Sequence, residues 1–250
     1  MERRIEKMNH REFRNLVPEK IDTCFLPIGT MEAHGCTNLG TDITIPEFIC
    51  STLAEKTNSL IAPTISYGIT RTLLPYPGSM TVSPESFQRY VSDVVISIFR
   101  AGFKQLIIIN GHGGHYDELR TIAKLAWEKQ KGKTIVIHWW ELCEHITKEI
   151  FSESGGHAGI NETAMVLSAD ETLVSPELCK EIKPFFVRDG SYVYPNPAPM
   201  LFYKKDERKS FFDKNSPRLD KEKAKKYSDA VLKYIEKFIN EVKEGWKINL

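Results

Sequence analysis

Acidic and histidine side chains gather directly after an apolar, strand-like segment near the N-terminus. The stretch LPIGTMEAHGCTNLGTD, residues 26–42, contains Glu32, His34 and Asp42 within eleven positions. Alternate side chains of an extended loop point the same way, so Glu32 and His34 can face a common point. A solvated loop would account for each residue alone, whereas the three together could converge on a cation.

Two further loops carry histidines and carboxylates. NGHGGHYD follows the apolar run LIII and contains His112 and His115. It has neither GxGxxG nor the GK[ST] of a phosphate-binding loop, so its glycines are better explained as letting His112 turn back over the strand end. SGGHAGINET contains His157, and also Glu162, which a helix N-terminus would favour even without a function. Together, these imidazole and carboxylate groups suit zinc, manganese or iron(II) better than calcium or magnesium.

Apolar runs predict the elements that must position these loops. Runs such as QLIIIN and TIVIHW lack polar alternation, which is typical of strands covered on both faces. The expected strands are residues 23–28, 60–62, 105–110 and 134–139, and the helical patterns are residues 83–102, 117–130, 162–168 and 220–245. Their alternation favours a mostly parallel sheet with helices on both faces, in which ligands bind at the carboxyl ends of the strands. Residues 187–217, rich in proline, aromatic and charged residues, indicate an ordered excursion near the site or a subunit interface.

Composition narrows the protein class. With 250 residues, 41% apolar and 27% charged, we expect a single globular domain over residues 1–250. The net charge of +1 calls for neither nucleic acid nor a membrane as partner, and no apolar run could span a bilayer or serve as a signal peptide. A cytoplasmic protein is therefore expected. The five cysteines form no CxxC pair, and Cys36 remains open as a nucleophile or thiolate ligand.

Four motifs in order, LPIGTMEAHG…GTD, PYPGSMTVSPESF, NGHGGH and HAGINETAMVL, closely resemble the creatininase (creatinine amidohydrolase) family. The resemblance extends motif by motif over roughly residues 20–170. It implies a three-layer α/β/α sandwich with a mostly parallel central sheet, a homohexamer, and two divalent ions per subunit, which are zinc, manganese or iron.

The resemblance also implies roles for individual residues. The ligands are Glu32, Asp42 and His112 for one ion, and His34, Asp42 and a further carboxylate for the other. Where creatininase carries that carboxylate, this chain has Gly114, so Glu162 is the candidate replacement as ligand and catalytic residue. His157 matches a histidine proposed to pass a proton to the leaving nitrogen. The candidate substrate-binding residues are Trp140, His115 and Tyr76 of the PYPGSM motif.

Departures from the family pattern bear on the substrate. The usual glutamine between the first two ligands is Ala33, and the usual asparagine after NGHGG is His115. A second tryptophan and a glutamate of the creatininase pocket are also unmatched, with Glu153 and Gly156 at those places. Creatinine itself is therefore not the expected substrate.

The sequence thus predicts a metal-dependent amidohydrolase that hydrolyses a small amide, formamide or cyclic amide with a metal-activated hydroxide. Hydrolytic C–C ring opening of an inositol-derived cyclic ketone, as by a 3-dehydro-scyllo-inosose hydrolase, is the main alternative. A peptidase of cofactor maturation and a non-catalytic metal or ligand binder remain open as well. The expected partner is a small-molecule substrate.

Overall fold

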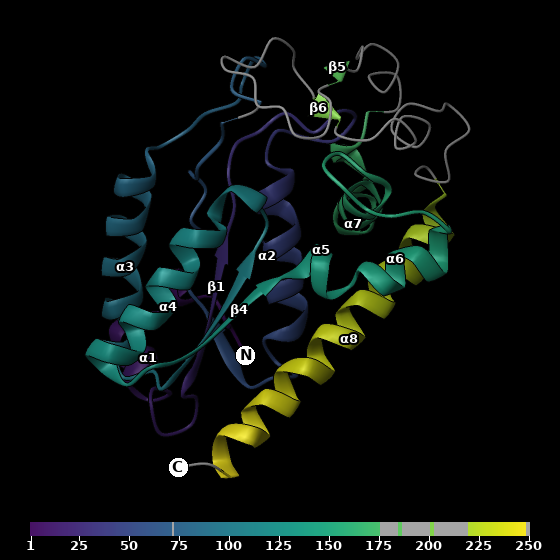
Figure 1. Cartoon of the computed structure of the whole chain (residues 1–250). Helices are drawn as coiled ribbons and strands as arrows, with labels where there is room; N and C mark the ends of the chain where they lie inside the picture. The colour runs from purple at the N-terminus through teal and green to yellow at the C-terminus, as the bar shows by residue number, and fades with distance from the viewer. Residues whose placement is uncertain (72, 176–184, 187–200, 203–219, 249–250) are drawn as a thin grey trace.

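A parallel sheet lies at the centre of the molecule (Figure 1). The computed structural model describes residues 1–71, 73–175, 185–186, 201–202 and 220–248. The sheet has the order β2-β1-β3-β4, with β1 (Thr23–Ile28), β2 (Ser59–Ile61), β3 (Gln105–Asn110) and β4 (Lys133–His138). β1 and β3 have the predicted bounds, and β2 and β4 lie one residue earlier. A separate parallel pair consists of β5 (Phe185–Phe186) and β6 (Leu201–Phe202).

Helices cover both faces of this sheet, which confirms the predicted three layers. One layer contains α1 (His10–Arg14), α3 (Pro84–Arg100) and α4 (Tyr116–Gln130). The other contains α2 (Thr41–Leu53), α6 (Glu144–Phe151), α7 (Ile160–Ala169) and the long α8 (Lys221–Ile248) (Figure 1). The remaining described elements are α5 (Trp139–Leu142) and short 3-10 turns at Ile5–Lys7, Gly113–His115 and Glu171–Leu173.

The strands divide their side chains between two hydrophobic cores. In β3, Ile107 packs into the core under α2, α7 and α8, whereas Ile108 packs into the core under α3 and α4. Phe25 and Leu26 of β1 alternate in the same way. All four side chains are fully buried, so apolar runs without polar alternation are what a sheet covered on both faces requires.

Helices α1, α2, α5 and α6 were not predicted from the sequence, and α2 is the one that carries a candidate ligand. From the sequence we expect Asp42 in a loop, whereas it lies in the first turn of α2. Pro46, inside the helix, has no N–H to donate to the carbonyl of Asp42 four residues earlier, and it masks the helical pattern. The two glycines at the ends of β1 and β3, Gly29 and Gly111, leave room for this carbonyl, because a Cβ on either would lie 2.2 or 2.0 Å from the Asp42 oxygen.

Two other expectations can be compared with the structure only for the residues that it describes. Of residues 187–217, only β6 lies among the described residues, so the predicted excursion falls almost wholly outside them. In the described part of the chain, no helix combines the length and apolar character needed to cross a membrane.

Candidate metal centre

The carboxyl ends of three strands form the floor of the site. Ile28, Asn110 and His138, the last residues of β1, β3 and β4, lie in register across the sheet. The loops that follow β1 and β3 therefore emerge side by side, as expected for ligand sites in parallel sheets. One loop carries Glu32 and the other carries His112, so the strand ends bring these two side chains together.

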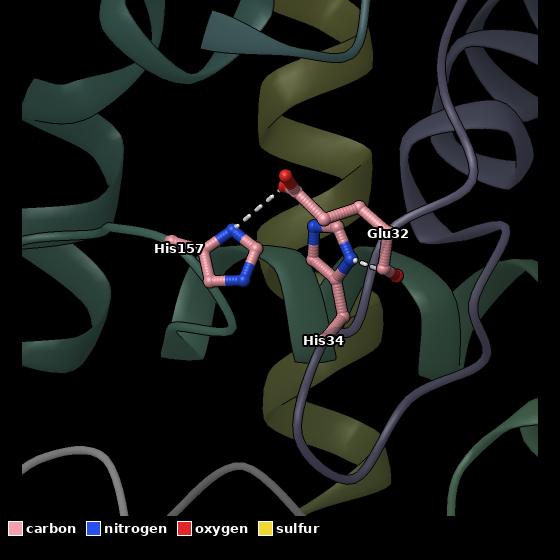
Figure 2. Close-up of side chains that lie close together, drawn as sticks. All are labelled: Glu32, His34 and His157. Carbon is pink, nitrogen blue, oxygen red and sulfur yellow. Dashed lines mark hydrogen bonds and ion pairs between the residues drawn. The ribbon is translucent and has the colours of Figure 1, made fainter. Parts of the chain in front are cut away.

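The loop after β1 is closed by its own hydrogen bonds. The amide of Glu32 donates to the carbonyl of Leu39 at 2.9 Å, and Gly35 adopts a positive φ of 58° that turns the chain back. Nδ1–H of His34 donates to the carbonyl of Glu32 at 2.9 Å, as Figure 2 shows. The proton of the His34 ring is thus held on Nδ1, and the lone pair of Nε2 faces the interior.

Glu32, Asp42 and His112 form a first ligand cluster. Nδ1 of His112 lies 2.9 Å from Oδ2 of Asp42 and 3.4 Å from Oε2 of Glu32. Nε2–H of His112 donates to the carbonyl of Ile69 at 3.0 Å, so its Nδ1 lone pair is directed at the two carboxylates. This arrangement, with the second imidazole nitrogen bound to a backbone carbonyl, is typical of histidine metal ligands.

His34, Asp42 and Glu162 form a second cluster. Nε2 of His34 lies 2.9 Å from Oδ1 of Asp42 and 3.9 Å from Oε2 of Glu162. Glu162 projects from the first turn of α7, as Asp42 does from the first turn of α2, and a helix N-terminus favours a carboxylate. Asp42 belongs to both clusters and faces each with a different oxygen, as a ligand bridging two ions would.

A third cluster joins His157 to Glu32 and His34. Nδ1 of His157 lies 3.6 Å from Oε2 of Glu32, and the rings of His157 and His34 have centroids 4.2 Å apart (Figure 2). Nε2–H of His157 donates to the carbonyl of Ala33 at 2.8 Å. The free Nδ1 lone pair of His157 therefore faces the same space as the other ligand atoms.

The donor atoms fit divalent cations. Nε2 of His34, Oδ2 of Asp42 and Oε2 of Glu162 are buried and lack a hydrogen-bond partner, although oppositely charged atoms lie nearby. Buried polar atoms of this kind are costly unless something satisfies them. One ligand atom from each of these three residues lies within 4.8 Å of those of the other two. Nitrogen and carboxylate donors of this number and kind suit zinc, manganese or iron.

The pKa shifts of the site residues also fit a site for cations. Burial alone would lower the pKa of His34, but the charge of Asp42 outweighs it and raises the pKa to about 10. Burial raises the pKa of Glu162 to about 8, although the charge of His34 opposes this. Despite its burial, Asp42 has a pKa held well below the usual range by His34 and His112. The protein without metal thus keeps protons where a cation would supply the positive charge.

The structure leaves no room for a side chain at Gly114. A Cβ at Gly114 would lie 2.4 Å from the carbonyl oxygen of Ile69 and 2.7 Å from Nε2 of His112. The hydrogen bond between these two groups occupies the space in which a side chain would start, so position 114 cannot carry a carboxylate. The second cluster takes its carboxylate from α7 instead, at the position predicted from HAGINET.

The structure places two of the predicted substrate-binding residues outside the lining of the cavity over the ligand clusters. His115 is fully buried, and its ring nitrogens contact Asn110 and the amide of Ile69. The hydroxyl of Tyr76 is buried as well, and neither residue lines the cavity over the ligand clusters. A motif shows that a residue lies near a site, but it does not show which way the side chain points.

The cavity over the clusters has a volume of about 590 Å³, which suits a small molecule. Trp140 lines it, as the sequence suggests. Tyr116, Asp117 and Arg71 also line it and were missed from the sequence. The first two follow NGHGGH directly, so their position after β3 could have indicated them, whereas no motif marks Arg71. Cys36 belongs to none of the three clusters found among the described residues.

Comparison with known proteins identifies the family of this chain. The sequence profile of creatininase (creatinine amidohydrolase) matches residues 6–239. The chain belongs to the creatininase family. One curated relative is a creatinine amidohydrolase of Pseudomonas putida, which is 23% identical over 68% of this chain and 73% of that protein. Another is a 3-dehydro-scyllo-inosose hydrolase of Thermotoga maritima, which is 24% identical over 90% of this chain and 79% of that protein.

Solved creatininase structures share the fold. A creatinine amidohydrolase superimposes with a TM-score of 0.81 at 20% identity, covering 96% of this chain and 97% of the other. A mutant creatininase of Zn–Zn type gives a TM-score of 0.81 at 21% identity, and a manganese form gives 0.80 at 20%, each covering 96% of this chain and 98% of the other. At such identities the likeness concerns the fold.

Proposed function

We propose that this chain is a metal-dependent amidohydrolase that hydrolyses a small amide, formamide or cyclic amide. The observation that carries the proposal is the pair of ligand clusters that share Asp42, with unpaired donor atoms facing one space. Glu32, Asp42 and His112 would hold one ion, and His34, Asp42 and Glu162 the other. The Zn–Zn and manganese forms of solved creatininases support these metals. When bound, the ions would make a water molecule more acidic and polarise the substrate carbonyl.

His157 is the residue that we assign to proton transfer. Its Nε2–H is held by the carbonyl of Ala33, which leaves Nδ1 as a base that faces the cavity. Burial, together with the charge of His34, lowers the pKa of His157 to about 3, so the ring is neutral at pH 7. Nδ1 takes a proton from water as the water oxygen bonds to the carbonyl carbon. It returns that proton to the nitrogen as the C–N bond breaks.

The cavity walls would orient the substrate. The ring of Trp140 stands edge-to-face with that of Tyr116, with centroids 6.0 Å apart, and provides a flat apolar surface. Arg71 offers an exposed cation, and Asp117 an anion, at other points of the lining. A planar amide with a polar or charged substituent matches such walls, and these side chains would select the substrate.

C–C ring opening is the second candidate. The inosose hydrolase of Thermotoga maritima aligns with 90% of this chain, whereas the creatinine amidohydrolase aligns with 68%. The same clusters could polarise a ketone carbonyl as well as an amide carbonyl. The two reactions differ in the bond that breaks, and hence in the atom that receives the proton from His157.

Metal analysis and a side-by-side substrate screen test the proposal. We expect about two equivalents of zinc, manganese or iron in the purified protein, and hydrolysis of a formamide, a linear amide or a cyclic amide that stops on chelation and returns when metal is restored. Full activity of the chelated protein would refute the metal dependence. Turnover of inositol-derived ketones alone would favour the second candidate, and turnover of short peptides alone would favour a peptidase.

A further inference from the structure

His115 occupies a position that the family pattern gives to asparagine, and the predicted substrate contact does not explain it. The ring is fully buried and stacks on Phe87, with centroids 4.4 Å apart and planes inclined by 18°. Nδ1 lies 3.0 Å from Oδ1 of Asn110, and Nε2 accepts the amide proton of Ile69 at 3.1 Å. Both ring nitrogens of the buried His115 therefore have hydrogen-bond partners, and the ring belongs to a hydrogen-bond network.

The protons of this network can be assigned from its partners. Nδ2 of Asn110 donates to the carbonyl of His112 at 2.7 Å and to Nδ1 of His138 at 2.9 Å. Oδ1 of Asn110 is therefore the acceptor for Nδ1–H of His115, and it also accepts the amide proton of His112 at 3.2 Å. Since Ile69 N–H can only donate, Nε2 of His115 carries the lone pair. The ring is neutral, with its proton on Nδ1.

The peptide groups of Ile69 link His115 to a metal-ligand candidate. The amide of Ile69 donates to His115, and the carbonyl of Ile69 accepts Nε2–H of His112. Because that bond holds the His112 proton on Nε2, the lone pair of Nδ1 remains directed at Asp42 and Glu32. Asn110, which His115 also contacts, binds both the amide and the carbonyl of His112.

We propose that His115 is a positioning residue: by holding Ile69 and Asn110 it fixes the orientation and the tautomer of His112, and so tunes the affinity of the Glu32–Asp42–His112 cluster for its divalent ion. The inference rests on the proposed function, because it requires that this cluster bind a metal. It gives His115 a role in the metal centre without contact with the metal or the substrate.

His115→Phe is the principal test. Phenylalanine keeps a ring that can stack on Phe87 but offers no partner to Ile69 or Asn110. In titrations of metal-free protein with Zn²⁺, we expect one of two binding steps to weaken by about 10- to 100-fold, the usual effect of losing a group that orients a ligand, while the other step is unchanged. His115→Gln, whose amide can accept from Ile69 N–H, should recover most of the loss. Phe87→Leu, which changes the packing of the His115 ring and of the core around it but removes none of its hydrogen bonds, is the matched control and should bind both ions as the wild type does.

Nitrogen NMR of the histidine side chains gives a second readout. Although burial opposes it, the carboxylate of Asp42 raises the pKa of His112, so the metal-free protein is measured at a pH high enough for this ring to be neutral. The wild type should show His112 with its proton on Nε2, and His115→Phe should show a mixture of both tautomers. A wild-type His112 with its proton on Nδ1 would overturn the inference even if His115→Phe did not fold. Equal Zn²⁺ affinities in the wild type and a folded His115→Phe protein would do the same. If the wild type bound no Zn²⁺ at all, the proposed function itself would fail.

Discussion

At the scale of single residues, backbone carbonyls determine which nitrogen of each histidine is free. The donor–acceptor pairs are His34 Nδ1–H with the carbonyl of Glu32, His112 Nε2–H with that of Ile69, and His157 Nε2–H with that of Ala33. A carbonyl oxygen cannot donate, so each ring presents one lone pair to the site in its neutral form. The loops thus prepare the ligands before any ion arrives.

The raised pKa values of His34 and Glu162 predict that metal binding releases protons. With pKa values of about 10 and about 8 in the metal-free protein, both groups hold protons at pH 7. A cation needs both deprotonated, so competition from protons decreases, and the apparent affinity increases, as the pH rises from 6 towards 9. Calorimetric titration with Zn²⁺ in two buffers of different ionisation enthalpy measures the protons released. Affinity independent of pH, without proton release, would contradict the assignment.

His157→Ala separates proton transfer from metal binding. If His157 moves protons without being a ligand, the variant should keep both ions and lose turnover on the order of 10²–10⁴-fold. Metal content and kcat of the same sample measure the two effects. The exposed His145 provides the control, since His145→Ala should change neither. Loss of one ion in His157→Ala would instead make His157 a ligand in the third cluster, with Glu32 and His34.

The sequence indicates which residue types converge on the site better than it indicates how each side chain is oriented. Glu32, His34 and His112 lie together because alternation along a loop and a turn at a strand end are local properties. The orientation of His115 depends on Phe87 and on the amide of Ile69, which are distant in sequence and carry no motif. Spacing alone could not have separated it from the cavity-lining residues.

At the scale of elements, helices supply the carboxylates that loops alone would hold loosely. Asp42 and Glu162 lie in the first turns of α2 and α7, and these two helices pack against one another. The positive end of each helix faces the carboxylates and partly offsets their mutual repulsion. Packing of α2 on α7 therefore sets the distance between two ligands of the second cluster.

Gly111→Ala should disturb this arrangement through the backbone of α2. Its Cβ would lie 2.0 Å from the carbonyl oxygen of Asp42, so the first turn of α2 must move away from β3. We expect a loss of about 1–3 kcal/mol in the free energy of unfolding, as for an overpacked core. Denaturant unfolding measures it. Gly245→Ala in α8, where no atom lies within 4 Å of the new Cβ, is the control and should gain at most about 1 kcal/mol. Equal stabilities of the two variants would refute the close packing.

The strands of the central sheet and the helices α3, α4, α7 and α8 were predictable because their apolar periodicity is local, whereas the short helices α1 and α6 were not predicted. The sequence predicts α3 from Ser83, and in the structure this side chain accepts the amide proton of Ser86 at the helix N-terminus. Helix α2 was not predicted because Pro46 and four polar residues among its first seven positions are typical of a loop sequence. Its stability comes from burial against the sheet and α7, which a single local window does not contain.

At the scale of the whole molecule, the site combines segments that are far apart in the chain. The ligand candidates come from the loop after β1, the first turn of α2, the loop after β3 and the start of α7. The sheet and two cores hold these segments together. The homohexamer and the single domain over residues 1–250 remain predictions, as does a cytoplasmic location. Whether or not these predictions hold, each ligand cluster is formed by residues of a single chain.

The separation of Asp42 from Glu162 also bears on when the protein can acquire its ions. During synthesis, His34 and Asp42 emerge long before α7, and the cluster that they share with Glu162 does not exist until residue 162 has left the ribosome and α7 has docked on α2. Before that point the growing chain contains the residues of the Glu32–Asp42–His112 cluster but lacks one member of the cluster that includes Glu162. If ions bind as the chain folds, the second ion would report that α7 has docked on α2.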